Sequence, residues 1–511
     1  MSVSISARKY LWGLCVLMLV LFFIRRTGPE DFMELGQHYQ LAYIMDVLAN
    51  GNWIMPHGVW GDVASKPPLS VWLSAILILP FQWTSPGFCL TLAYIPSALA
   101  SLGMAFLIFH IGRRCFDERI GILGAFMWAL SYFGFRSLTF LRADPLFGFL
   151  TFLSACLAFQ AMRRDGGWIF FWLIAALATL AKGPLTLLLV LGGFILCRSE
   201  FWRKPDGMTS RWRGFGLGLI FYLAIILSWF LVAMAAEGNR VAEKQIGNEL
   251  FGHLLSGEEG SLPLSHFWQM PYFFIVAFLP WSIPAMVGLV RVFRKPPEQR
   301  KRRLAAQYLA GYFVFGLIVF SIAPHQRAYY LMPLIPAACL LGAPVLLEWK
   351  EKWIPRERWP GLILAFSLLF IAIAVNYIYI IRPNHHSYYR YKCSKGMKYM
   401  IEPLVEAGLP LTFTDTPYAL QYLLGIHQEQ IPRKEARKML LSDKPAYVVV
   451  NNAWKLIRGL PDPDENGPYL LMQFPDGLYP FFSLYSNQRS FAPEIWQTAV
   501  SDNPSSNTTS R

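Results

Sequence analysis

Long apolar runs separated by short charged segments dominate this sequence of 511 residues. About 20 apolar residues in a helix cross about 30 Å of hydrocarbon, so runs of this length predict membrane-spanning helices. We expect eleven spans, at about residues 10–23, 89–112, 120–137, 145–162, 168–182, 184–198, 214–236, 267–292, 305–323, 330–347 and 360–381. The pattern therefore predicts an α-helical polytopic membrane protein.

Basic residues collect in the loops on one side of these spans. They lie at Arg113-Arg114 and Arg163-Arg164 and in the segments 203–213, 294–303 and 350–358. Because cytoplasmic loops are enriched in Lys and Arg, the N-terminus is expected in the cytoplasm and the C-terminal region on the periplasmic face of the inner membrane. This orientation explains the net charge of +14 better than nucleic-acid binding does.

The first outer loop, at about residues 26–88, is long and mostly polar. Its apolar piece Leu69–Phe81 is not counted as a span, because one more crossing would move every later basic loop to the outer face. We predict instead a juxtamembrane or re-entrant helix over Lys66–Phe81. Pro67 and Pro68 are expected in its first turn, where a missing N–H costs nothing.

The chain changes character beyond about residue 383, where polar residues return. Strand-like runs and helical patterns alternate there, at 409–413, 446–450 and 469–474 for strands and near 396–407 and 433–441 for helices. We predict a transmembrane domain over 1–382, a small α/β periplasmic domain over 383–498, and a disordered tail over 499–511.

Charged residues also stand at the predicted outer ends of several spans. They are Lys66 in the first loop, Arg142 and Asp144 before the fourth span, Lys182, and Arg327 in a short outer turn. Each alone fits an ordinary role, as a snorkelling anchor, a helix cap or an interfacial residue. Together, three or four cations and a carboxylate on one membrane face indicate a site for an anionic headgroup such as a lipid phosphate.

Several short strings occur in a fixed order along the chain. They are Gly51-Asn-Trp and, twelve residues later, Lys66-Pro-Pro-Leu; Ala-Lys182-Gly-Pro; Asn248-Glu249 with Phe-Leu-Pro280-Trp-Ser; and Arg327-Ala-Tyr-Tyr-Leu-Met-Pro-Leu-Ile-Pro336. This ordered combination resembles the GT-C-fold glycosyltransferases, specifically the bacterial aminoarabinose transferases and the dolichyl-phosphate-mannose protein mannosyltransferases. The resemblance covers about two thirds of the chain.

The resemblance implies that a sugar moves, with inversion, from a polyprenyl-phosphate donor to a lipid, glycan or protein acceptor on the outer face. It implies phosphate binding by Lys66 and Arg327, with Arg142 and Lys182 as further candidates, since a leaving phosphate needs electrostatic stabilisation. Tyr330 is a further candidate for donor binding. Asp144 is expected to orient or activate the acceptor, whose hydroxyl needs a carboxylate base.

The sequence departs from the family at the position of this base. An Asp-Glu pair opens the first outer helix in the family, whereas the ungapped equivalents here are Gly36 and Gln37. The nearest carboxylates lie about one turn upstream, at Glu30, Asp31 and Glu34. Either one of these three supplies the base through a gapped fit, or Asp144 serves as base, or the protein is inactive.

Cofactor use is equally open. Ser65 stands where the aminoarabinose enzymes carry a Glu that helps to bind metal, so the sequence assigns no cofactor and leaves a divalent cation as an alternative.

Two other classes of function are alternatives to the glycosyltransferase. One is a lipid or polysaccharide transporter, which usually places polar groups near the membrane midplane and often has internal repeats. The other is a catalytically inactive scaffold.

Overall fold

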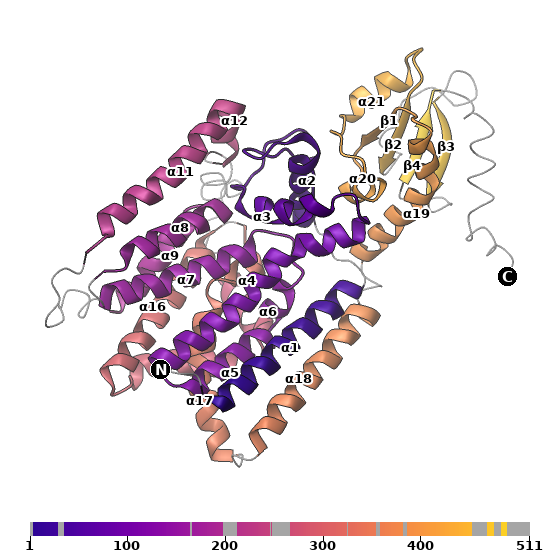
Figure 1. Ribbon diagram of the computed structural model, residues 1–511. Coiled ribbons are helices and arrows are strands. Elements are labelled where there is room, and N and C mark those ends of the chain that lie inside the picture. The colour runs from indigo at the N-terminus through magenta and orange to yellow at the C-terminus, as the bar shows by residue number, and fades with distance from the viewer. Residues whose placement is uncertain are drawn as a thin grey trace.

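The computed structural model is a bundle of helices from which a small sheet domain projects at one end (Figure 1). The N-terminus lies at the other end of the bundle. The structure describes residues 4–28, 35–163, 166–197, 212–245, 247, 266–323, 325–353, 358–381, 386–451, 468–474 and 482–487.

Each apolar run of the sequence contains a helix. The helices of the bundle are α1 (Ile5–Thr27), α4 (Pro86–Cys115), α5 (Glu118–Ala129), α6 (Tyr132–Ser137), α7 (Asp144–Arg163), α8 (Trp168–Lys182), α9 (Leu185–Ile195), α11 (Phe215–Glu237), α12 (Asn239–Val241), α14 (Gln269–Ala277), α15 (Ser282–Arg294), α16 (Arg300–Ile322), η4 (Ala328–Leu331), α17 (Ile335–Trp353), α18 (Trp359–Asn376) and η6 (Tyr377–Ile381). All of them except α12 contribute to one large apolar core.

The structure does not confirm the count of eleven spans. Among the described residues, six helices are long and apolar enough to cross a membrane, and a seventh span is reached if α14 and α15, bent by 120°, count as one. Helices α8 and α9 have 15 and 11 residues, so they rise only about 22 and 16 Å, less than the hydrocarbon thickness. The chain is a multi-pass membrane protein with several shorter or broken helices.

The first loop folds into α2 (Leu35–Asn50), α3 (Leu69–Ile78) and the short η1 (Leu79–Phe81). A helix therefore occurs where a juxtamembrane helix was predicted, but it begins later. Pro68 is its N-cap, so neither proline lies in the first turn. Helix α3 buries one face against α4, where Ser74 Oγ donates to the Ala93 carbonyl at 3.0 Å.

The sheet domain contains α19 (His386–Glu406), α20 (Tyr418–Leu424), α21 (Arg433–Leu440) and the strands β1 (Leu411–Thr414), β2 (Tyr447–Asn451), β3 (Tyr469–Phe474) and β4 (Phe482–Ser486). The strand order is β1-β2-β4-β3. Strands β1 and β2 are parallel, and β4 is antiparallel to both of its neighbours. The α/β prediction is confirmed, whereas the predicted tail over 499–511 lies outside the described residues.

This domain packs against the first loop. Tyr418 and Tyr422 of α20 belong to the same apolar core as Leu41 of α2. The Tyr422 hydroxyl donates to the Pro86 carbonyl at 2.5 Å, and the backbone N–H of Gln430 donates to the Val59 carbonyl at 2.7 Å. The sheet domain is therefore anchored to the loop rather than only tethered to the bundle.

The two ends of the bundle differ in charge. At one end, Arg302 donates to the Phe116 carbonyl at 3.3 Å, and Arg119 pairs with Glu351 at 3.3 Å. These contacts bring several predicted basic loops together. Asp144 and Arg163 are the two ends of α7, so the charged groups around Asp144 lie at the opposite end.

Helices α4 and α5 approach closely because each presents a glycine to the other. A Cβ at Gly112 would lie 2.5 Å from the Gly121 Cα, and a Cβ at Gly121 would lie 2.5 Å from the Phe109 carbonyl oxygen. Only glycine at both positions allows this contact, which joins the two helices within the large core.

We expect Gly121→Ala to push these helices apart and to destabilise the protein by about 1–3 kcal/mol, the usual range for overpacking. The measurement is the thermal unfolding midpoint of the purified protein in detergent. Gly216→Ala in α11 is the matched control, because a Cβ there meets nothing within 4 Å. Equal midpoints for the two variants would contradict the close-packing account.

Candidate active site

A cavity of about 330 Å³ lies at the end of the bundle next to α2 and the sheet domain. Six separate parts of the chain line it. Its lining residues are Gly36, Tyr39, Gln40, Tyr43, Asp62, Ser65, Lys66, Arg142, Ala143, Asp144, Lys182, Lys244 and Tyr330.

Helix α2 forms one wall of the cavity. Gly36, Tyr39, Gln40 and Tyr43 are spaced three and four residues apart, so they share one helical face. Gln40 also donates to Ser70 Oγ of α3 at 3.0 Å, which fixes α2 against the helix that follows Lys66. The wall is thus rigidly connected to the loop opposite it.

Asp144 is the buried anion of the site. It is only 3% exposed, and its two carboxylate oxygens engage different cations. Lys182 pairs with Oδ1, and Arg142 Nε pairs with Oδ2 at 3.0 Å. A buried carboxylate must be paired or hydrogen-bonded, and here the pairing holds two cations at the cavity wall.

Aromatic rings support the same two cations. The Arg142 guanidinium lies 4.7 Å from the centre of the Tyr329 ring, and Lys182 Nζ lies 4.4 Å from that of Tyr330. Both tyrosines belong to η4. Cation–π contacts of this kind restrict the positions of the charged groups.

The loop between α2 and α3 contributes the remaining charges. Lys66 is partly buried and lines the cavity. Asp62 also lines it and pairs with Lys244, whose Nζ lies 3.1 Å from Asp62 Oδ2. Four cations and two carboxylates thus line the described cavity, which leaves an excess of two positive charges.

The structure brings together five of the residues predicted for the site: Lys66, Arg142, Asp144, Lys182 and Tyr330. Arg327 is exposed and does not line the cavity, although it directly precedes η4. The three proposed bases, Glu30, Asp31 and Glu34, lie outside the described residues, as do Asn248 and Glu249.

The positions that departed from the family motif have structural roles here. Gln37 is fully buried and accepts a hydrogen bond from the Leu141 amide at 2.9 Å, so it ties α2 to the segment before α7. The Arg142 guanidinium lies directly against Gly36, in the space that a side chain would fill. The structure therefore places a cation where a side chain at position 36 would lie.

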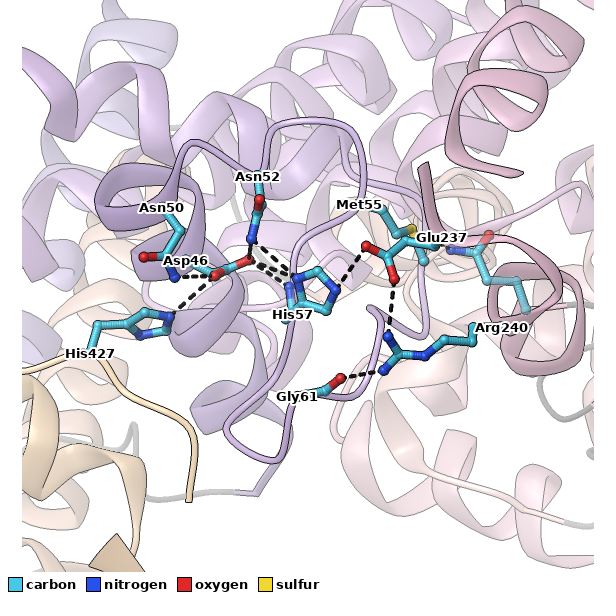
Figure 2. Close-up of polar contacts among 10 residues, drawn as sticks. Asp46, Asn50, Asn52, Met55, His57, Gly61, Glu237, Arg240 and His427 are labelled. Carbon is cyan, nitrogen blue, oxygen red and sulfur yellow. Dashed lines mark hydrogen bonds and ion pairs between the residues drawn. The ribbon is translucent and has the colours of Figure 1, made fainter. Parts of the chain in front are cut away.

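A second polar network, which the sequence did not reveal, lies beside the cavity (Figure 2). Its centre is Asp46, which is 2% exposed. The Asp46 carboxylate accepts from Asn50 at 2.7 Å, from Asn52 at 2.9 Å and from the His57 amide at 2.7 Å, and His427 Nε2 lies 3.3 Å away. His427 thereby links the sheet domain to α2.

The network continues from His57 to the end of α11. His57 Nε2 lies 3.1 Å from Glu237 Oε1, and Glu237 pairs with Arg240 at 3.1 Å. Arg240 in turn donates to the Gly61 carbonyl at 2.5 Å (Figure 2). No short motif links these residues, so only their three-dimensional arrangement shows the connection.

These contacts shift the pKa values of His57 and Asp46 in opposite directions. The hydrogen bond to Asp46 raises the pKa of His57, partly opposed by burial and assisted by Glu237. Burial would raise the pKa of Asp46, but hydrogen bonds from His427 and His57 lower it well below its usual range. Below its raised pKa, His57 is therefore a cation between two carboxylates.

Comparisons with known proteins place this geometry in a wider context. Residues 65–234 match the family described as dolichyl-phosphate-mannose-protein mannosyltransferase, and residues 264–398 match the Alg9-like mannosyltransferase family. Over 94% of its length, the chain superposes with a TM-score of 0.67, at 15% identity, on 98% of the crystal structure of ArnT from Cupriavidus metallidurans bound to undecaprenyl phosphate. The apo structure of ArnT gives a TM-score of 0.68. The chain has the GT-C fold.

Relatives of known name agree with the GT-C assignment. The undecaprenyl phosphate-alpha-4-amino-4-deoxy-L-arabinose arabinosyl transferase of Pseudomonas aeruginosa is 24% identical over 74% of this chain and 67% of its own length. Arabinosyl transferase 1 of Pseudomonas fluorescens is 25% identical over 60% of this chain and 52% of its own length. The chain thus spans between about half and two thirds of these relatives, and its resemblance to transferases that use polyprenyl-phosphate-linked sugars is confirmed.

The described part of this GT-C site does not fit a divalent cation. No group of three or more His, Cys, Asp or Glu among the described residues is placed to hold a metal ion. The two cavity carboxylates already pair with Lys or Arg, and Ser65 offers only a hydroxyl.

We expect His57→Gln to lower the thermal midpoint at pH 6 and to have a smaller effect at pH 9. A group with a raised folded-state pKa stabilises fully below its unfolded pKa, about 6.5 for His, and this stabilisation disappears as the pH rises through the folded pKa. The measurement is thermal unfolding in detergent across this range, with exposed His266→Gln as control. A cost that does not change with pH would contradict the charged state assigned to His57.

Proposed function

We propose that this protein transfers a sugar from a polyprenyl-phosphate carrier to an acceptor at the membrane face that holds the cavity. The observation that supports this function best is the cluster of Lys66, Arg142, Lys182 and Lys244 around one cavity. A leaving phosphate carries negative charge, and fixed cations stabilise that charge in a partly desolvated site. Apolar helices next to the cavity would hold the isoprenoid tail.

Lys66, Arg142 and Lys182 are proposed to bind the phosphate, with Tyr330 beside Lys182. Arg327 is retained as a proposed phosphate contact, because its carbonyl accepts the Tyr330 amide at 3.0 Å and it therefore belongs to the same turn. Asp144 is proposed to orient Arg142 and Lys182 rather than to take a proton, since both of its oxygens are engaged.

The donor and acceptor classes come from the relatives. Several are named for undecaprenyl phosphate-linked 4-amino-4-deoxy-L-arabinose, and the ArnT crystal structure holds undecaprenyl phosphate. We propose this lipid-linked sugar as the donor and a lipid of the cell envelope as the acceptor. A glycan or a protein acceptor is the alternative, because the matching family model is that of a protein mannosyltransferase.

An inactive relative that binds the lipid without transfer is the second candidate. The observation that favours it is Gly36, where the Arg142 guanidinium occupies the space of the family's carboxylate. Retained binding of undecaprenyl phosphate together with no turnover would distinguish it. A transporter is less well supported, because the charged cavity lies at one end of α7 rather than at its middle.

We further propose that the protein lies in the inner membrane, with the N-terminus in the cytoplasm and the cavity and sheet domain in the periplasm. The basic ends of α4, α7 and α17 support this orientation by the positive-inside rule. The helix ends that carry Lys182 and Asp144 would then face outward.

We expect Lys66→Ala to lower kcat/KM by about 10²–10³-fold, the usual cost of losing one group that stabilises transition-state charge. Lys66→Arg should retain part of the activity, because it keeps the charge. The measurement is turnover of the undecaprenyl-linked aminoarabinose with total envelope lipid as acceptor. Lys295→Ala, an exposed cation beyond α15, is the matched control, and wild-type turnover by Lys66→Ala would rule out the assigned role.

A reporter that is active only outside the cytoplasm, fused after Ile381, should be active. The same reporter fused after Lys295 should be silent, since that loop is expected in the cytoplasm. Activity is measured in intact cells, with immunoblotting to confirm equal expression. The opposite pattern would invert the proposed orientation.

A further inference from the structure

We propose that Asp62 is the carboxylate that takes the proton from the acceptor hydroxyl. This inference rests on the proposed glycosyl transfer and names a catalytic residue for it. Asp62 belongs to neither the first turn of α2 nor the charged cluster before α7, where the sequence pointed.

The described part of the cavity offers two carboxylates, Asp62 and Asp144. Asp144 is poorly suited to accept a proton, because it is buried and each of its oxygens pairs with a cation. Protonating it would remove the anionic partner of the partly buried Arg142 and Lys182, which is costly. Its geometry is that of a positioning residue.

Asp62 differs from Asp144 in its exposure and in the number of cations that pair with it. Its side chain is 31% exposed and pairs with one cation, Lys244, through Oδ2. Its other oxygen, Oδ1, is buried and has no hydrogen-bond partner among the described residues. A general base needs a carboxylate that can reach the acceptor proton, and Asp62 has a single cation partner and is the more exposed of the two cavity carboxylates.

The loop is shaped to hold this carboxylate in place. Gly58 and Asp62 close a tight turn, in which the Gly58 amide donates to the Asp62 carbonyl at 2.7 Å. A Cβ at Gly58 would lie 2.5 Å from Asp62 Oδ1, so the absence of a side chain there makes room for the carboxylate. Gly61 has a φ of +66°, which a residue with a side chain rarely adopts.

Four neighbouring parts of the structure, α2, α11, α12 and the sheet domain, fix the turn from outside. His57, at its start, is held by Asp46 of α2 and by Glu237 of α11 (Figure 2). The Arg240 guanidinium donates a hydrogen bond to the Gly61 carbonyl, and the backbone N–H of Gln430 donates one to the Val59 carbonyl. A general base must stay within hydrogen-bond reach of its proton, and this network supplies that rigidity.

The chemical step balances without another reactant. The acceptor O–H bond breaks, and its proton moves to the Asp62 carboxylate. The acceptor oxygen forms a bond to the sugar C1, and the bond from C1 to the phosphate oxygen breaks. The electron pair of that bond leaves with the polyprenyl phosphate, whose charge the cavity cations stabilise.

The test compares Asp62→Asn and Asp62→Ala with the wild-type protein, using undecaprenyl-linked aminoarabinose and total envelope lipid. Loss of a general base should lower kcat by about 10²–10⁴-fold, with binding of undecaprenyl phosphate unchanged. Sodium azide is the second acceptor, because this anion has no proton to lose. Asp62→Ala should form the glycosyl azide at a rate close to that of the wild type.

The controls separate failure of this inference from failure of the proposed function. Glu429→Gln removes a carboxylate that lies beside Gly61 but does not line the cavity, and it should turn over normally. No turnover by the wild-type protein would overturn the proposed function itself. Wild-type turnover by Asp62→Asn, or loss of azide transfer together with lipid transfer in Asp62→Ala, would overturn the role of Asp62 alone.

Discussion

The cavity depends on one buried carboxylate, Asp144, that holds two cations in place at its wall. Removing an ion from water costs several kcal/mol, and pairing with the two oxygens of Asp144 offsets this cost for the partly buried Arg142 and Lys182. The rings of Tyr329 and Tyr330 restrict the same cations further. The result is a fixed positive wall, which needs no rearrangement when negative charge develops on a leaving group.

The opposite side of the cavity is a loop without regular secondary structure, and it is kept in shape by its neighbours. Helix α2, the end of α11 and the sheet domain each contribute side chains or backbone groups to it. Because a buried polar network is stable only when its members are satisfied, the Asp46 contacts constrain the loop as a unit. Contacts made outside the cavity therefore determine where the loop holds Lys66 and Asp62.

The sequence predicted the fold class and half of the site, for identifiable reasons. Lys66, Arg142, Asp144 and Lys182 were recognisable because ionisable residues at span ends are rare and the charge pattern placed them on one face. Lys244 was not, since it stands among ordinary polar residues, and its role comes only from the fold that brings it to Asp62. The count of eleven spans is not confirmed, because α8 and α9 are short and α14 and α15 are bent relative to each other, and apolar composition alone does not reveal such a break.

The hydrogen bond between Gln430 and Val59 has a consequence for how such proteins diversify. A domain that supports the loop beside the proposed reaction centre is part of that site's framework, although it lies outside the bundle. Replacing the sheet domain with the corresponding domain of a relative would change the contacts that this domain makes with the loop. We therefore expect two segments that are distant in the sequence, residues 56–64 and the segment around His427, to coevolve.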